Sequence, residues 1–289
     1  MVLVILLYMF LASTFVLAKN ALAYASPCFL IGFRSVIAGI LLLGYLFLRN
    51  KKQLSIKKED LLLFFKVAIV HIYLAFLFDF WSLQYVSALK STLLFSTTPF
   101  VAAALAYFLL HERLKKGQVL GILLGLLGMI PVLMAGRDSE FGFASLFSIS
   151  FPEVVLMGAV VCGAYAWFMV KRLMDKGYSL SLINGFAMLV GGIMHLVSSM
   201  LFENIAHPVI AWGPFLGWTT LLILVSNIIF YNLYGLLLKK FSITFLTFAG
   251  FLCPGFGALY AWLWGTSVLS WHYIVSIALV TAGLYLYSY

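Results

Sequence analysis

Long apolar runs dominate the sequence, and short polar segments separate them. Most runs have about 20 residues, the length that an α-helix needs to cross the hydrocarbon core of a bilayer. The runs are continuously apolar, without the alternation that marks the strands of a membrane barrel. The pattern predicts ten membrane-spanning helices, at residues 1–20, 27–48, 61–84, 88–110, 117–135, 153–172, 180–202, 214–237, 241–263 and 270–288.

The composition agrees with this all-α integral membrane class. Of the 289 residues, 64% are hydrophobic and only 9% are charged, whereas about a quarter of the residues of an ordinary soluble domain are charged. Ten spans leave no room for a sizeable soluble domain. An ordinary soluble protein is therefore excluded.

The formal net charge of +9 is distributed in short islands along the chain and does not form one patch. This distribution argues against a nucleic-acid partner, for which the basic residues would gather on one face. Most Lys and Arg residues follow the even-numbered segments, in the ranges 49–58, 113–116, 171–176 and 239–240. Because cytoplasmic loops carry an excess of positive charge, we expect these loops and both termini to be cytoplasmic.

The sequence contains signs of an internal repeat. Three residue identities recur at a spacing of 155 positions, and they are Ser87 and Ser242, Pro99 and Pro254, and Gly128 and Gly283. The segments divide into five in 1–135 and five in 153–289, joined by an external polar loop at 136–152. Two halves with an odd number of spans insert in opposite directions, so the pattern predicts inverted repeats with a binding site between them near the membrane midplane.

Several motifs resemble the EamA-type repeat of the drug/metabolite transporter superfamily. They are, in order, Tyr85-Val86-Ser87-Ala88, Thr98-Pro99, His111-Glu112-Arg113-Leu114, Gly121 and Gly128. Arg34 also stands where this repeat commonly has an arginine. The second repeat departs from the pattern, because Ser267 and Val268 replace the Glu-Arg pair. The length and aromatic content are most similar to the S-adenosylmethionine/S-adenosylhomocysteine exchangers of intracellular bacteria, and the resemblance implies a secondary transporter.

Four charged residues inside the expected helices are candidate substrate-binding residues. Asp79 lies at a depth similar to that of Lys19, Arg34 and Lys90. A charge at the centre of a spanning helix costs about 2.5–3.5 kcal/mol on insertion scales, so it needs a partner, a wet cavity or a nearby interface. One interpretation is a site for a ligand with a carboxylate or a phosphate. The alternative is an Asp79 ion pair that fastens two helices, with Lys19 extending to the surface.

Aromatic residues make up 17% of the chain, more than interfacial belts require. Aromatic and polar side chains at helical spacing are candidates to line a cavity, and these are Tyr8, Phe15 and Lys19 on the first segment, Phe95 on the fourth, and Asn227 and Tyr231 on the eighth. Such faces bind a flat ring by stacking, or a sulfonium or ammonium group by cation–π attraction. The alternative is that they pack against lipid or other helices.

The sequence carries little that would support other chemistry. Cys28, Cys162 and Cys253 have no paired spacing and no nearby His, which argues against a disulfide framework or a zinc site. His71 and His195 lack an acidic neighbour at helical spacing, so we interpret them as packing residues. The alternative is that a histidine carries a proton through a coupled transport cycle. A membrane enzyme would need a catalytic constellation, a channel would need a selectivity segment, and an ATP-driven pump would need a nucleotide-binding fingerprint. None of these three patterns stands out in the sequence.

We therefore expect a cofactor-free transporter that works by alternating access within the lipid bilayer. Its substrate would be a small zwitterionic or aromatic metabolite, with S-adenosylmethionine exchanged for S-adenosylhomocysteine as the best candidate. The alternative within the superfamily is an exporter of an amino acid or a nucleoside-type metabolite. A polytopic membrane enzyme remains as an alternative from another class.

Overall fold

The computed structural model describes residues 2–82, 85–86, 94–95, 97–111, 115–135, 150–203, 208–263 and 271–288. The elements of the first half are α1 (Val2–Leu22), α2 (Pro27–Arg49), η1 (Lys51–Leu54), α3 (Lys58–Val67), η2 (Ala68–Leu74), α4 (Ala75–Ser82), α6 (Thr98–Leu110) and α7 (Lys116–Ala135). Those of the second half are α8 (Phe151–Asp175), α9 (Leu180–Phe202), α10 (Trp212–Leu222), η4 (Ile223–Phe230), α11 (Tyr231–Leu237), α12 (Ile243–Ala249), η5 (Gly250–Leu252), α13 (Cys253–Leu263) and α14 (Trp271–Ser288).

The chain is an all-helical integral membrane protein. Within the described ranges, six helical stretches are long and apolar enough to cross a bilayer, and these are Val2–Leu22, Pro27–Arg49, Lys58–Ser82, Phe151–Asp175, Leu180–Phe202 and Trp212–Leu237. Four shorter apolar helices accompany them. The side chains on the outer surface are largely apolar, as a protein surrounded by hydrocarbon requires.

Two of these long stretches change their hydrogen-bonding pattern in the middle. In Lys58–Ser82 the segment η2 is π-helical, and in Trp212–Leu237 the segment η4 is π-helical. The segment η4 begins 155 residues after η2. Because π-helical turns are uncommon and are frequent at functional sites, their presence at matching places draws attention to His71 in η2 and Asn227 in η4.

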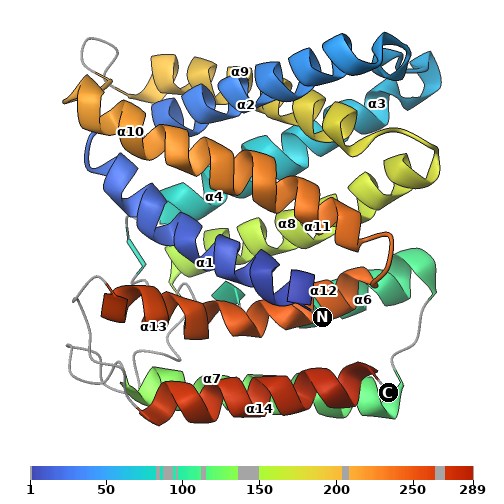
Figure 1. Cartoon of the computed structure of the whole chain (residues 1–289), viewed down its shortest axis with the longest axis vertical. Coiled ribbons are helices and arrows are strands. Elements are labelled where there is room, and N and C mark those ends of the chain that lie inside the picture. Colours follow the sequence, from blue (N-terminus) through green and yellow to red (C-terminus); the bar gives the residue numbers. More distant parts are fainter. Residues whose placement is uncertain are drawn as a thin grey trace.

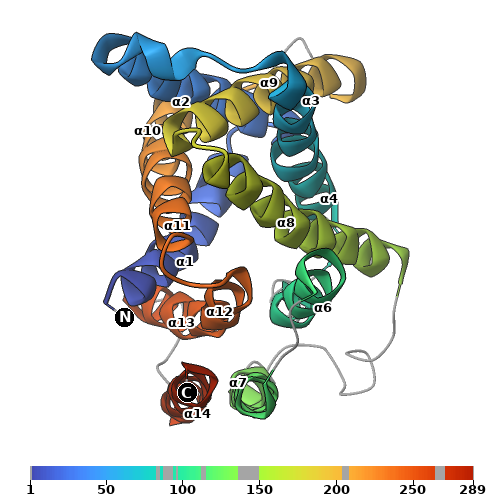
Figure 2. The same cartoon turned by 90° about the vertical axis from the view of Figure 1, so that its right-hand side faces the viewer.

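Two antiparallel helix pairs form the opposite ends of the long axis of the molecule. Figures 1 and 2 show α2 beside α9 at one end and α7 beside α14 at the other, with the remaining helices between them. Glycines allow both pairs to approach closely. A methyl group at Gly39 would come within 2.7 Å of the Leu189 backbone nitrogen, and one at Gly121 within 2.6 Å of the Gly283 carbonyl oxygen.

The contacts between α2 and α9 are reciprocal. Gly185 lies 153 residues after Gly32, and Leu196 lies 153 residues after Leu43. A methyl group at Gly32 would meet Leu196, and a methyl group at Gly185 would meet Leu43. Each helix therefore presents the same sequence positions to the other, as two copies related by a two-fold axis do.

The basic connections lie together at one end of the bundle. Figure 1 shows the α2–α3, α8–α9 and α11–α12 connections on the same side as the two chain ends. The lysines and arginines of 49–58, 171–176 and 239–240 lie in these connections or in the helix ends that flank them. We call this side the basic end of the bundle.

At the end of the bundle opposite the basic end, Glu203 joins the last residues of α9 to the start of α2. Its carboxylate accepts hydrogen bonds from the backbone N–H groups of Cys28 at 2.7 Å and Phe29 at 3.0 Å. These two donors belong to the first turn of α2, where backbone N–H groups lack partners within the helix. Burial opposes the ionisation of Glu203, but the hydrogen bonds from Ser199 and from the start of α2 outweigh it and hold the pKa of the carboxyl below its ordinary value.

Candidate functional site

Arg34 is buried in the middle of α2 and points toward α4. Its side chain is 3% exposed, and its guanidinium carbon lies 4.9 Å from the ring centroid of Phe76 and 5.8 Å from that of Phe80. Cation–π attraction is stronger when the partners are shielded from water. The two rings therefore offset part of the cost of placing a permanent charge inside the bundle.

Asp79 faces this arginine from α4. The two residues attract each other electrostatically, yet within the described ranges they form no direct ion pair. The Oδ1 atom of Asp79 and the Nε atom of Arg34 are both buried and lack a hydrogen-bond partner in the described part of the chain. Buried polar atoms are nearly always paired in native proteins, so this pair has hydrogen-bonding capacity left for a ligand.

A cluster of aromatic rings adjoins these charges, with Tyr231 as the link. Tyr231 lies near both Arg34 and Asp79. Its ring centroid lies 5.1 Å from that of His71 and 5.7 Å from that of Trp167. His71 also lies edge-on to Trp167, with the centroids 4.7 Å apart. The rings come from η2, α8 and α11, so both halves of the chain contribute to the cluster.

Tyr234 and Asn227 extend the site along the helix that carries Tyr231. Tyr234 stacks on Trp167 with the centroids 3.9 Å apart, and its hydroxyl has no hydrogen-bond partner among the described residues. Asn227 is fully buried, and its Nδ2 atom lies 3.7 Å from the sulfur of Met188 on α9. The Oδ1 atom of Asn227 also lacks a partner in the described part, which adds an unused acceptor to this region.

Of the other predicted site residues, the structure describes the side chains of Tyr8, Lys19 and Phe95. Tyr8 is buried near Tyr234, and its hydroxyl donates a hydrogen bond to the carbonyl oxygen of Leu246. Lys19 is exposed in the last turn of α1, and Phe95 packs in a separate cluster around Leu156. Lys90 lies outside the described residues, as does the side chain of Phe15. The structure thus brings together Arg34, Asp79 and Tyr231, with Asn227 one turn before Tyr231.

Two contributors to the cluster, His71 and Trp167, were not predicted to line the site. Tyr234 shares a face with Asn227 and Tyr231 at helical spacing, so the sequence pattern indicates it as a cavity-lining residue. Trp167 carries no such signal, because nothing in its own segment distinguishes it from a packing residue. His71 was singled out only as an intramembrane polar residue, eight positions from Asp79. The sequence does not show that its ring would meet Trp167.

His195 makes a polar contact through one ring nitrogen, while its other ring nitrogen, Nδ1, is buried without a hydrogen-bond partner among the described residues. Its Nε2 atom lies 3.1 Å from the Ile72 carbonyl oxygen, and its ring packs against Tyr73 with the centroids 5.0 Å apart. The Tyr73 hydroxyl in turn lies 2.8 Å from the Ser198 hydroxyl. These contacts join α9 to η2, and they fit a role in helix packing.

Comparison with curated proteins places the chain among transporters. It is 33% identical over 259 residues to the S-adenosylmethionine/S-adenosylhomocysteine transporter of Chlamydia muridarum, covering 87% of this chain and 80% of that protein. The protein of the same name from Chlamydia trachomatis serovar L2 is 31% identical over 259 residues, covering 87% of this chain and 77% of that protein. Such identity over most of both chains supports common descent and a common fold.

A solved structure shares the fold of this chain, and a family model identifies its family. A solved structure titled only "Crystal structure of protein" superposes with a TM-score of 0.77 at 20% identity, covering 98% of this chain and 93% of that chain. This likeness shows the fold alone. The model of the EamA-like transporter family matches residues 1–134 and again residues 150–289. The chain therefore belongs to the EamA-like transporter family.

Proposed function

We propose that this chain takes up S-adenosylmethionine in exchange for S-adenosylhomocysteine by alternating access. The observation that carries the proposal is the opposed charge pair of Arg34 and Asp79, each with an unpartnered buried atom, beside the ring of Tyr231. The names of the chlamydial relatives support the same substrate. A secondary transporter needs a site of this kind inside the bundle, and it needs no cofactor.

The chemical groups of S-adenosylmethionine match the groups in the site. Its carboxylate complements the guanidinium of Arg34, because arginine forms paired hydrogen bonds with a carboxylate. Its ammonium complements Asp79. Its sulfonium and its adenine suit the faces of the Tyr231 and Trp167 rings. S-adenosylhomocysteine keeps the carboxylate, the ammonium and the adenine, so the same site accepts both molecules in turn.

An exporter of an amino acid or of a nucleoside-type metabolite is the second candidate. Arg34 and Asp79 by themselves complement the carboxylate and ammonium of any α-amino acid, and this observation favours the amino-acid form of the alternative. The two candidates differ in the use of the rings. Competition by methionine or by adenosine alone separates them from recognition of the complete S-adenosyl compound.

We also propose that residues 1–135 and 153–289 form two inverted repeats of five spanning helices each, joined by the loop at 136–152. The reciprocal contacts between α2 and α9 support this arrangement, and so do the matching places of η2 and η4. The family model matches the chain twice, once in each half. Antiparallel pairing of equivalent helices is what an axis in the membrane plane produces.

The location that fits these features is the inner membrane of a bacterium, with the basic end in the cytoplasm. The concentration of lysine and arginine at one end supports this orientation. Reporter proteins fused after Tyr289 test it, because a fluorescent protein folds only on the cytoplasmic side and alkaline phosphatase is active only outside. An active phosphatase fusion would contradict the orientation.

Uptake by proteoliposomes tests the substrate. We expect labelled S-adenosylmethionine to accumulate when the lumen contains S-adenosylhomocysteine and to remain near background when the lumen is empty. An excess of unlabelled S-adenosylhomocysteine outside should compete. Equal uptake with an empty lumen would contradict exchange, and competition by methionine alone would favour the amino-acid alternative.

A pair of variants tests the site. Asp79→Asn removes the charge at nearly constant volume, and we expect it to lower the uptake rate about tenfold or more with little change in folded yield. Asp175→Asn is the matched control, because Asp175 is exposed at the end of α8. Equal uptake by Asp79→Asn at equal abundance would assign Asp79 to helix packing.

A further inference from the structure

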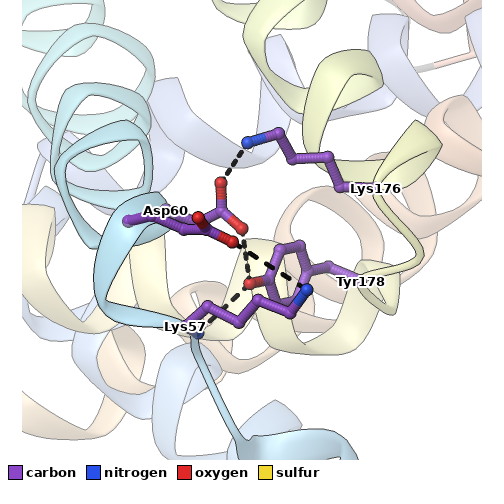
Figure 3. Close-up of polar contacts among 5 residues, drawn as sticks. Lys57, Asp60, Lys176 and Tyr178 are labelled. Carbon is purple, nitrogen blue, oxygen red and sulfur yellow. Dashed lines mark hydrogen bonds and ion pairs between the residues drawn. The ribbon is translucent and has the colours of Figure 1, made fainter.

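A buried acidic residue at the basic end ties the two halves of the chain together. Asp60 lies in the first turn of α3 and is 2% exposed. Its carboxylate forms an ion pair with the ammonium of Lys176 and accepts a hydrogen bond from the Tyr178 hydroxyl at 2.7 Å. The Tyr178 hydroxyl accepts in turn from the backbone N–H of Lys57 at 3.2 Å. Figure 3 shows these groups converging from α3 and from the turn between α8 and α9.

This cluster differs from a surface ion pair that lies beside it. In that pair, the Nζ atom of Lys57 lies 3.9 Å from the Oε1 atom of Glu59, and the two side chains are 75% and 71% exposed. Both residues belong to the same half of the chain. Exposed pairs of this kind contribute little, because water screens them. The Asp60 carboxylate is shielded from water, so each of its hydrogen bonds matters more to the state in which they form.

The cluster lies at one end of a buried helix face, and the aromatic rings of the candidate site lie further along the same face. Asp60, Phe64 and His71 are all buried positions of Lys58–Ser82, at spacings of four and seven residues. Phe64 lies edge-on to Tyr178, with the centroids 5.0 Å apart, so the aromatic part of the cluster continues inward from the charged part. His71 meets the Trp167 ring of the candidate site.

The cluster also differs in kind from the close helix packing that joins the two halves elsewhere. The pairing of α2 with α9 rests on backbone approach at glycines, such as Gly39 against Leu189, and such close packing does not part without exposing a large matched surface. The ion pair involves Lys176, whose side chain is 43% exposed. Water replaces the partners of such groups when they separate, so this contact can form and break repeatedly.

We propose that the Asp60–Lys176–Tyr178 cluster is the gate at the basic end of the transport path. The cluster is formed when the central site is closed to that end, and it is broken when the site opens there. The inference rests on the proposed alternating access, because a gate has a purpose only if the site opens to each end in turn. It assigns a role to residues that do not touch the substrate.

Labelling of a buried reporter cysteine tests the gate without any substrate. Ala68→Cys, in a background where the three native cysteines are replaced by alanine, places a thiol at a fully buried position between Phe64 and His71. The reagent is a water-soluble maleimide. We expect Asp60→Asn and Lys176→Gln each to raise the labelling rate about tenfold, the change that a shift of about 1.4 kcal/mol produces in an equilibrium.

Two further variants complete the test. The exchanged pair Asp60→Lys with Lys176→Asp should restore the labelling rate to within about twofold of the parent, because it rebuilds the attraction. Glu59→Gln is the matched control and should label like the parent. If Asp60→Asn fails to fold, Lys176→Gln decides, because the lysine lies in a partly exposed turn. Unchanged labelling in well-folded Lys176→Gln would overturn the gate.

The outcome is separable from the outcome for the transport proposal. Labelling reports the opening of the basic end, whatever the substrate is. A parent protein that fails to exchange S-adenosylmethionine, with variants that label faster, would reject the substrate and keep the gate. Normal exchange by the parent, with unchanged labelling in the variants, would reject the gate and keep the substrate.

Discussion

The guanidinium carbon of Arg34 on α2 lies 4.9 Å from the ring centroid of Phe76 on α4. This contact holds a permanent cation in the interior without a direct ion pair to Asp79, three residues further along α4. Because a ring attracts a cation less strongly than a carboxylate does, the guanidinium keeps donors for a ligand. The site is therefore held in place before the substrate arrives.

The first prediction concerns the shape of this cation. Arg34→Lys keeps the charge but removes the planar fork that stacks on Phe76 and pairs with a carboxylate. We expect uptake to fall about tenfold in kcat/KM, measured in proteoliposomes. The matched control is Arg49→Lys, because Arg49 also lies over a ring, that of Tyr45 at 5.7 Å, but is exposed at the end of α2. Equal loss in both variants would contradict a specific role for Arg34.

The second prediction concerns the side-chain oxygen of Asn227, which has no hydrogen-bond partner in the described part of the chain. Asn227→Ala removes an acceptor that we expect the substrate to use, so uptake should fall about fivefold to tenfold, as the loss of one buried hydrogen bond produces. Asn232→Ala is the control, because the Asn232 side chain bonds the carbonyl oxygen of Ile228 on its own helix at 2.7 Å. The measurement is the uptake rate at equal protein abundance. Normal uptake by Asn227→Ala would remove Asn227 from the site.

The third prediction concerns the pairing of α2 with α9. In Gly39→Ala, the added methyl group would come within 2.7 Å of the Leu189 backbone nitrogen, so the helices must separate. We expect a loss of stability of about 1–3 kcal/mol, as overpacking typically produces, seen as a lower Tm in detergent. In Gly44→Ala on the same helix, the methyl group would meet nothing within 4 Å. Gly44→Ala should leave Tm unchanged or raise it slightly.

The fourth prediction is a pH dependence that arises from Glu203. Because its pKa is held below the ordinary value of 4.5, the ionised carboxylate stabilises the folded state. This contribution is complete above the ordinary value and is lost as the pH falls through the lowered pKa. Glu203→Gln should lower Tm at neutral pH, by about 0.5–2 kcal/mol of stability as capping groups contribute.

The comparison of Tm at neutral and acidic pH checks this prediction. The difference between Glu203→Gln and the parent should begin to shrink once the pH falls below the ordinary value of 4.5 and should vanish once it has fallen through the lowered pKa, because the parent then loses its carboxylate as well. Glu59→Gln is the control, since Glu59 is 71% exposed and its removal should change Tm little. A difference that stays constant with pH would contradict the assignment.

The helix ranges predicted from the sequence agree closely with the observed helices where the apolar run is long. The run at 180–202 became α9 (Leu180–Phe202), and that at 27–48 became α2 (Pro27–Arg49). The family was identified from motifs that lie partly outside the described residues, and the match to the EamA-like family confirmed it. The sequence indicates Arg34 and Asp79 as site residues only through the free-energy cost of a charge in a membrane-spanning helix, because such a charge needs a partner or a polar cavity.

The sequence did not determine which face of each helix points inward. In water, the apolar face of a helix marks the core, but in a bilayer the lipid is as apolar as the core, so the contrast disappears. Tyr8 and Tyr231 therefore looked alike as candidates, although Tyr8 bonds the Leu246 carbonyl and Tyr231 faces Arg34.

The sequence by itself determined the membrane class, the ranges of the six long apolar helices and the cost of the buried charges, because these depend on local composition and on the thickness of a bilayer. Only the tertiary structure decided that Trp167 meets His71 and that Asp60 meets Lys176. Both pairs join residues about a hundred positions apart, and their meeting depends on how helices rotate and cross. That choice is made by close packing between neighbours, and no single helix carries it in its own sequence.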